Sequence, residues 1–188
     1  MDTIFTKEII VHKTLCRVIG VSVFVMLTAL GAFVRIPLPF TPVPITLQTF
    51  FVLLSGAFLG SGLGAIAQLS YALIGISGLP IFSSAGSGLS YLFGPTGGYI
   101  FGFVLAALFV GRFIKYNQNN LFYTFVLFSL GDIILLFCGM IWLKLILGYP
   151  FSKLLFIGFL PFVPGDILKA WVASVLYLKI KSRLKEIL

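Results

Sequence analysis

The sequence predicts an all-α integral membrane protein with about six transmembrane helices in a single domain, residues 1–188. Of these 188 residues, 60% are hydrophobic and only 10% are charged, whereas a soluble domain is closer to half apolar and a quarter charged. The chain also contains 21 phenylalanines, and no soluble core of this size needs so much apolar surface. Lipid must therefore surround much of the chain.

The predicted spans follow from the apolar runs, because a helix needs about 20 apolar residues to cross the hydrocarbon layer. They lie at about 15–34, 45–59, 62–77, 91–114, 121–147 and 164–181. The second and third runs have about 16 residues each and are joined by Gly60-Ser61-Gly62. We interpret them as two short helices with a reversal between them, because glycine makes an easy turn; a single bent helix is the alternative.

Three segments are predicted to be loops. Residues 36–44 contain four prolines, which remove hydrogen-bond donors and forbid a helix, so this segment should be extended and stiff. Residues 78–90 carry no charge and many small side chains, and residues 115–120 form the most polar stretch. A short apolar piece, 154–160, is expected at the outer surface, before the last helix begins near Pro164.

The basic residues predict the orientation in the membrane. Nine lie in the terminal segments and the loop between the fourth and fifth spans: Lys7, Lys13, Arg17, Arg112, Lys115, Lys179, Lys181, Arg183 and Lys185. Three lie on the other side: Arg35, Lys144 and Lys153. The positive-inside rule therefore predicts that both termini are cytoplasmic, and that the loops at 36–44 and 78–90 face outward.

Composition and motifs exclude several functions. The net charge of +8 is explained by membrane orientation and not by nucleic-acid binding, because no basic face persists beyond a few residues. Cys16 and Cys138 form no CxxC pair and His12 is the single histidine, so we expect no metal site and no cofactor. The sequence has no Walker A, HExxH or GxSxG motif. The chain cannot hydrolyse ATP itself, so energy for any transport must come from a partner or a gradient.

The most informative residues are two charges in segment 161–169. Asp166 and Lys169 stand at i and i+3 and so share one helix face, and charges inside a membrane mark function by default. We predict that they line a binding pocket; a mutually neutralising structural pair is the alternative, and both roles are compatible. Asp166 also lies in the first helical turn, where the helix dipole favours an anion. Asp132 has no obvious partner and is expected to face the bundle interior or to stay protonated.

Several uncharged side chains complete the candidate site. Gln48 opens the second helix after the Pro-rich loop and either contacts a ligand or anchors that loop. Ser84 is one of several hydroxyls in the outward loop at 78–90. Phe82, Tyr91, Tyr99 and Trp171 are aromatic, and such residues anchor the membrane interface by default. The predicted topology places both outward loops and the start of the sixth helix on one side of the membrane.

Four segments that span nearly the whole chain carry a family resemblance. They read IPLPFTPVPITLQT at 36–49, GLPIF at 78–82, GPTGGY at 94–99 and LPFVPGDILK at 160–169. In this order and spacing they resemble the BioY family, the biotin-specific substrate-binding (S) components of energy-coupling factor (ECF) transporters. The resemblance implies a six-helix S-component bundle in the cytoplasmic membrane of a prokaryote, with ligand held near the outer face under loops that act as a lid. It also implies docking onto a transmembrane coupling subunit and two ATPase subunits.

The resemblance also supplies a ligand, biotin, whose ureido group has two N–H donors and one carbonyl acceptor. Asp166 would accept from the N–H groups, and Lys169 would donate to an oxygen. Phe82, Tyr91 or Trp171 would cover the apolar bicyclic ring.

Two further roles come from the resemblance. Some relatives carry Arg at the position of Gly94, where it would suit the biotin carboxylate; here the amides of Gly97 and Gly98, at a helix start, would take that role. The first helix of the family often shows Ala-xxx-Ala for docking, and Thr28 and Ala32 would stand in for it here.

The predicted function is therefore biotin uptake, with this chain as the high-affinity component that captures the vitamin. The alternatives are an S-component for another small vitamin and a membrane-embedded enzyme using Asp132, Asp166 and Lys169. The enzyme requires these groups to converge, and their predicted depths differ. A purely structural subunit is disfavoured, because buried charges such as Asp166 and Lys169 are costly.

Overall fold

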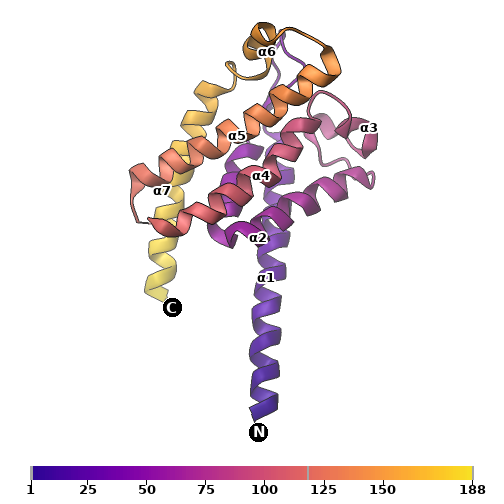
Figure 1. Ribbon diagram of the computed structural model, residues 1–188. Coiled ribbons are helices and arrows are strands. Elements are labelled where there is room, and N and C mark those ends of the chain that lie inside the picture. The colour runs from indigo at the N-terminus through magenta and orange to yellow at the C-terminus, as the bar shows by residue number, and fades with distance from the viewer. Residues whose placement is uncertain (1, 118, 188) are drawn as a thin grey trace.

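The fold is a bundle of helices in which the short helix α6 lies at the end opposite both termini (Figure 1). The computed structural model describes the backbone of residues 2–117 and 119–187 and the side chains of residues 14–117 and 119–183. Its elements are α1 (Asp2–Phe33), β1 (Arg35–Ile36), β2 (Ile45–Thr46), α2 (Gln48–Ile76), η1 (Ser83–Ala85), α3 (Gly88–Leu92), α4 (Gly97–Phe113), η2 (Ile114–Tyr116), α5 (Leu121–Leu147), α6 (Phe151–Gly158) and α7 (Val163–Ile187). The side chains of His12, Lys7, Lys13 and Lys185 lie outside the described residues.

The helix α2 folds back on itself at Gly60. This residue has φ 79° and ψ 176°, a conformation that glycine adopts without steric cost. Gln68 Nε2 donates to Ser55 Oγ at 3.0 Å, although residues this far apart on a straight helix would be separated by about 20 Å. A Cβ on Gly64 would lie 2.9 Å from Gly56 Cα, so the two halves touch backbone to backbone. The segment therefore forms two short helices with a reversal and not a single bent helix.

The fourth helix starts later than its sequence predicted. Residues 88–92 form the separate short helix α3, and α4 begins only at Gly97. Pro95 lies between them, and proline both lacks an N–H and clashes with the preceding turn, so no helix continues through it. Helix α5 spans Leu121–Leu147 as predicted. Helix α1 begins at Asp2, well before the predicted residue 15, and α7 continues to Ile187, beyond the predicted residue 181.

The described helices are long and apolar enough to cross a membrane. Four qualify by length and composition, at Thr14–Phe33, Gln48–Ile76, Gly97–Tyr116 and Leu121–Leu147. The pair α6 and α7, bent by 47° at the break between them, makes a fifth. With the reversal in α2 counted as two short passes, the described part of the chain has about six. Large side chains such as Phe101, Phe122 and Leu145 are exposed on the bundle surface, where lipid is their solvent. The protein is a multi-pass membrane protein.

Glycines set the closest contacts between neighbouring helices. A Cβ on Gly56 of α2 would lie 2.5 Å from the carbonyl oxygen of Ala107 in α4. One on Gly102 of α4 would lie 2.9 Å from Cα of Leu135 in α5. Small residues at these positions let the backbones approach closely, which is how helices gain contact energy inside lipid. The helices α2, α4 and α5 thus form a tightly joined unit.

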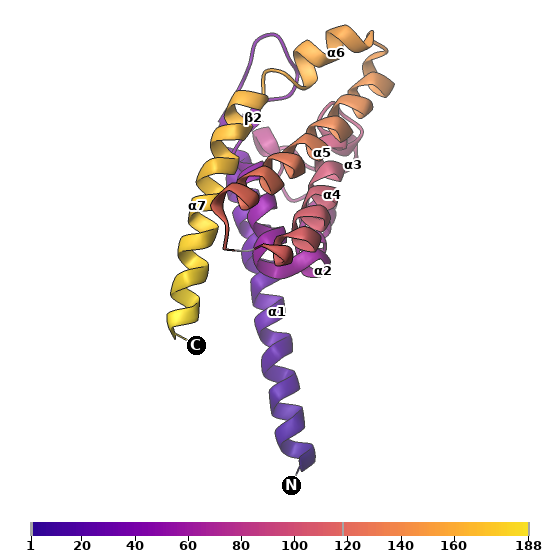
Figure 2. The same cartoon turned by 60° about the vertical axis from the view of Figure 1, so that its left-hand side comes forward.

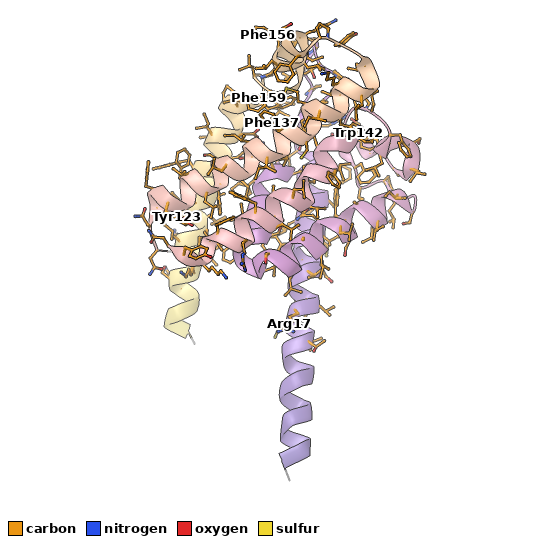
Figure 3. All side chains as sticks on the ribbon, in the orientation of Figure 1. Arg17, Tyr123, Phe137, Trp142, Phe156 and Phe159 are labelled. Carbon is orange, nitrogen blue, oxygen red and sulfur yellow. The ribbon has the colours of Figure 1, made fainter. Side chains whose placement is uncertain are left out.

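The N-terminal part of α1 extends beyond the rest of the bundle, as Figure 1 and Figure 2 both show. Arg17 lies on this projecting part (Figure 3). The C-terminal part of α1 instead packs against α2, and a Cβ on Gly31 would lie 3.0 Å from the backbone nitrogen of Gln48. Only this second part of α1 therefore helps to position the residues of the site.

Candidate ligand-binding site

A cavity lies between α2, α4, α5, the start of α7 and the loops that precede α2 and α3. The volume inside it is about 50 Å³. It is lined by Val43, Pro44, Thr46, Gln48, Thr49, Tyr71, Ser83, Tyr91, Thr96, Tyr99, Ile100, Phe103, Leu135, Leu136, Phe162, Asp166 and Lys169. Four residues singled out from the sequence thus meet at one place: Gln48, Tyr91, Asp166 and Lys169.

Asp166 and Lys169 form an ion pair in the cavity wall, with Lys169 Nζ 2.6 Å from Asp166 Oδ1. Lys169 Nζ also donates to the carbonyl oxygen of Thr46 at 3.0 Å and to Thr49 Oγ1 at 2.6 Å. An ammonium group has three protons, so these three acceptors use all of them. Asp166 Oδ2, in contrast, is buried and has no hydrogen-bond partner in the part of the chain that the structure describes. The pair therefore offers a ligand one anionic acceptor.

The local sequence explains why this pair stands where it does. Pro164 lies in the first turn of α7, where its missing N–H costs nothing. Asp166 follows in the same turn, near the positive end of the helix dipole, and its amide donates to the Phe162 carbonyl at 2.9 Å. Lys169 lies one turn further along the same face. Because Lys169 bonds to Thr46, the pair also ties α7 to the strand before α2.

Gln48 is held between two loops by polar contacts. Its Nε2 donates to Tyr71 OH at 2.6 Å, and Tyr71 OH donates to the carbonyl oxygen of Ile81 at 3.1 Å. On its other side, Thr46 Oγ1 donates to Gln48 Oε1 at 3.2 Å. The side chain therefore lines the cavity and joins the loop before α2 to the loop before α3.

Aromatic rings form the wall nearest α3. Tyr91 lines the cavity and stacks on Phe82, with ring centroids 4.9 Å apart. Phe82 is fully buried and meets Tyr71 edge-on at 5.5 Å. Gly75 makes room for the Phe82 ring, because a Cβ at that position would collide with it. Phe82 thus supports Tyr91 and Tyr71 from behind and does not itself line the cavity.

Ser84 and Trp171 lie outside the cavity. Ser84 has a positive φ of 65°, and Arg35 Nη1 donates to its Oγ. Its neighbour Ser83 lines the cavity instead. Trp171 is 47% exposed on α7 and packs edge-on against Phe125.

Gly97 and Gly98 also lie outside the cavity, at the start of α4. A Cβ on Gly98 would collide with Trp142, and one on Gly97 would collide with the backbone of Leu92. Trp142 closes this contact by donating from Nε1 to the carbonyl oxygen of Gly94 at 3.0 Å, and Figure 3 shows its ring on α5 near α3 and α4. The two glycines thus serve close packing between α3, α4 and α5.

Sequence reasoning did not assign several lining residues to the site, among them Thr49, Tyr71 and Tyr99. Tyr71 and Tyr99 lie on apolar helices, where a hydroxyl must find a partner inside the bundle. Tyr99 OH does so by donating to the Gly158 carbonyl at 2.7 Å. A search for hydroxyls inside predicted spans would have singled out both tyrosines, and Thr49 directly follows Gln48.

Asp132 is buried in α5, one helical turn away from the cavity. It is 3% exposed, and neither carboxylate oxygen has a hydrogen-bond partner among the described residues. Leu135 and Leu136, one turn further along α5, line the cavity where Asp132 does not. Asp132 is nevertheless close enough to Asp166 and Lys169 to interact with both electrostatically. It faces the interior of the bundle.

Thr28 and Ala32, the pair expected to dock a coupling subunit, are both 0% exposed. Thr28 Oγ1 donates to the Phe24 carbonyl at 2.8 Å and lies 3.4 Å from Gln68 Oε1. In this structure the pair packs against α2 inside the chain, and it forms no part of the outer surface of α1.

A bundle of membrane helices with a largely apolar cavity that carries a few polar and charged side chains, next to two loops, has the architecture of a solute-binding membrane protein. The BioY family profile matches residues 6–186. Biotin transporter BioY of Thermotoga maritima is 36% identical, over 88% of this chain and 96% of its own length. Probable biotin transporter BioY of Pyrococcus horikoshii is 37% identical, over 83% and 90%. The crystal structure of the S-component for biotin from an ECF-type ABC transporter matches with a TM-score of 0.85 and 26% identity, over 91% of this chain and 93% of that one. The chain belongs to the BioY family.

Proposed function

We propose that this protein captures biotin at the outer face of the cytoplasmic membrane, as the substrate-binding component of an uptake system. The observation that carries the proposal is Asp166 Oδ2, which is buried in the cavity wall and has no hydrogen-bond partner among the described residues. A buried anionic oxygen without a donor is costly, so a ligand with N–H groups is its natural partner. The ureido group of biotin has two such groups, and the relatives above are named for biotin transport.

The rest of the cavity suits the same ligand. Lys169 and Thr49 hold the Asp166 carboxylate in place, so that Oδ2 can accept from a ureido N–H. Tyr91 and Phe103 supply aromatic surface for the bicyclic ring, and such apolar walls are usual for small-ligand sites. A charge-assisted hydrogen bond contributes about 1.5–3 kcal/mol. Asp166 is therefore the residue that we expect to contribute most to binding.

Transport requires a source of energy outside this chain, because the sequence has no nucleotide-binding motif. We propose that a transmembrane coupling subunit and two ATPase subunits supply it, in the cytoplasmic membrane of a prokaryote. The nine basic residues in the termini and the α4–α5 loop, against three on the other side, support an arrangement with both termini in the cytoplasm.

Another small vitamin in the same cavity is the nearest alternative ligand. An enzyme built from Asp132, Asp166 and Lys169 is not favoured, because the relatives are named transporters. In addition, Asp132 does not line the cavity in which Asp166 and Lys169 lie.

Equilibrium binding of radiolabelled biotin to the purified chain in detergent micelles tests the proposal. We expect saturable binding that unlabelled biotin displaces and that thiamine or riboflavin does not. Stronger displacement by another vitamin would remove biotin as the ligand. Absence of saturable binding for every vitamin tested would remove the substrate-capturing role.

A further inference from the structure

A second hollow lies on the outer side of the cavity, and we call it the vestibule. Pro44, Tyr91 and Thr96 line both the vestibule and the cavity, so the two spaces are neighbours separated by these side chains. The vestibule is the more polar of the two, and its wall includes Ser84 and Ser87. A ligand held at the Asp166 end of the cavity therefore has its other end directed toward the vestibule.

Arg35 is placed beside this vestibule. It belongs to β1, where it pairs with Thr46 of β2, and its Nη1 donates to Ser84 Oγ on the vestibule wall. Its charge also acts on Tyr91: burial raises the pKa of the Tyr91 phenol, and the Arg35 charge opposes that rise. The guanidinium thus lies close to both a wall residue and the side chain that separates the two hollows.

Arg35 has no carboxylate partner among the described side chains. The chain has five acidic residues, and Asp132 and Asp166 are the two whose side chains are described. Asp132 lies in α5 and Asp166 pairs with Lys169. The remaining three stand at positions 2, 8 and 186, in the terminal segments of the chain. Among the described side chains, Arg35 therefore has no anionic partner, and its guanidinium can accept one from a ligand.

The backbone around Ser84 is also unusual. Ser84 and Ala85 both have positive φ values, 65° and 56°, which non-glycine residues adopt at a cost. Such conformations persist where surrounding contacts hold them, and they recur at ligand clamps. The contact from Arg35 to Ser84 joins the loop before α2 to the loop before α3 beside the vestibule.

We propose that Arg35 binds the carboxylate of the ligand in the vestibule, and that Ser84 is the positioning residue that holds the guanidinium ready. This inference rests on the proposed biotin function. The deep end of the site is a neutral ion pair with one free acceptor, which suits N–H groups. The outer end presents a guanidinium, whose planar fork binds a carboxylate through two parallel hydrogen bonds. The site therefore suits a ligand that has N–H donors at the end near Asp166 and a negative charge at the end near Arg35.

The test compares biotin with biotinamide, which has the same ring and chain but no negative charge. Titration calorimetry would be run with the full-length parent, Arg35→Gln and Arg35→Lys, each checked for folding by gel filtration. Lys153→Gln is the matched control: it removes a cation from the same predicted side of the membrane, but Lys153 lies over the Tyr149 ring, away from the vestibule lining.

We expect Arg35→Gln to weaken biotin binding about ten- to a hundredfold, the scale of a charge-assisted contact, and to leave biotinamide binding unchanged. Arg35→Lys should keep part of the affinity for biotin, and Lys153→Gln should change neither ligand. The parent should itself bind biotinamide more weakly than biotin by a similar factor, and this comparison needs no variant to fold. Equal losses for both ligands in Arg35→Gln, or equal affinities of the parent for both, would overturn the inference while leaving biotin capture intact. A parent that binds neither ligand would instead overturn the proposed function itself, and the inference with it.

Discussion

Asp166 and Asp132 are both buried carboxylates on membrane-crossing helices, but their surroundings are opposite. Asp166 is 5% exposed, lines the cavity and has Lys169 at 2.6 Å. Asp132 is 3% exposed, lies one turn away from the cavity lining and has no hydrogen-bond partner among the described residues. Burial alone therefore does not identify a binding residue. A counter-ion together with access to a cavity distinguishes the two positions.

The difference has an energetic consequence. A charge inside the membrane is costly unless it is paired, and removing one member of a buried pair costs more than removing both, because the other charge stays behind. Asp166 depends on Lys169 in this way, whereas Asp132 has no such partner to lose. Substitutions of Lys169, Asp166 and Asp132 should therefore differ in how large their effects are and in whether they affect stability or biotin binding.

The largest effect is expected for Lys169→Met, which leaves Asp166 as a buried charge without its counter-ion. We expect the free energy of unfolding to fall by about 3–5 kcal/mol, and biotin binding to weaken at the same time. Thermal unfolding in detergent measures the first effect and titration calorimetry the second. Lys179→Met, an exposed position on the same helix, is the control that should change neither. A Lys169→Met protein as stable as the parent would mean that the pair contributes nothing to the fold.

Asp166→Asn should have a smaller effect, confined mostly to binding. The amide keeps the shape of the side chain and loses the anion, so biotin should bind about ten- to a hundredfold more weakly, which corresponds to about 1.5–3 kcal/mol. The double variant with Lys169→Met should lose less than the sum of the single variants, because the two residues contact each other. Calorimetric titration of biotin into the two single variants and the double variant, each folded, measures the three affinities. Binding as tight as in the parent would leave the pair with a structural role only.

Asp132→Asn should have the smallest effect of the three. No hydrogen bond to Asp132 is broken, so we expect the affinity for biotin to stay within about threefold of the parent, well under 1.4 kcal/mol. Titration of biotin into Asp132→Asn measures this affinity, and Asp166→Asn, the same substitution at the other carboxylate, is the comparison. A loss as large as that of Asp166→Asn would show that Asp132 belongs to the binding site.

Asp166 is expected to lie toward the outer face of the membrane, and cysteine labelling can test that orientation. Asn119 is at the opposite end of the bundle, where Lys181 Nζ donates to its Oδ1 at 3.0 Å, and the basic residues nearby predict that this end is cytoplasmic. In a background without Cys16 and Cys138, a cysteine at Asn119 should not react with an impermeant reagent added to intact cells. A cysteine at Ser87, in the loop that is predicted to face outward, should react. The reverse pattern would invert the orientation.

Much of the fold follows from local sequence properties. Apolar composition and run length indicate a membrane bundle, and α5 spans Leu121–Leu147 as predicted. Proline and glycine set several boundaries, such as the reversal at Gly60. The start of α4 was misplaced because the apolar run continues through Pro95, and hydropathy alone does not register the missing N–H.

The site is only partly readable from the sequence, for a physical reason. The spacing of Asp166 and Lys169 determines that they share one face of a helix, since this depends on helix geometry alone. What that face meets depends on contacts such as Lys169 with Thr46, 123 positions apart in the chain. The tertiary structure alone decided that Ser83 and not Ser84 lines the cavity, that Phe82 supports Tyr91 from behind, and that Ala32 is buried. Those outcomes depend on which helices pack together, and local pattern carries no information about that choice.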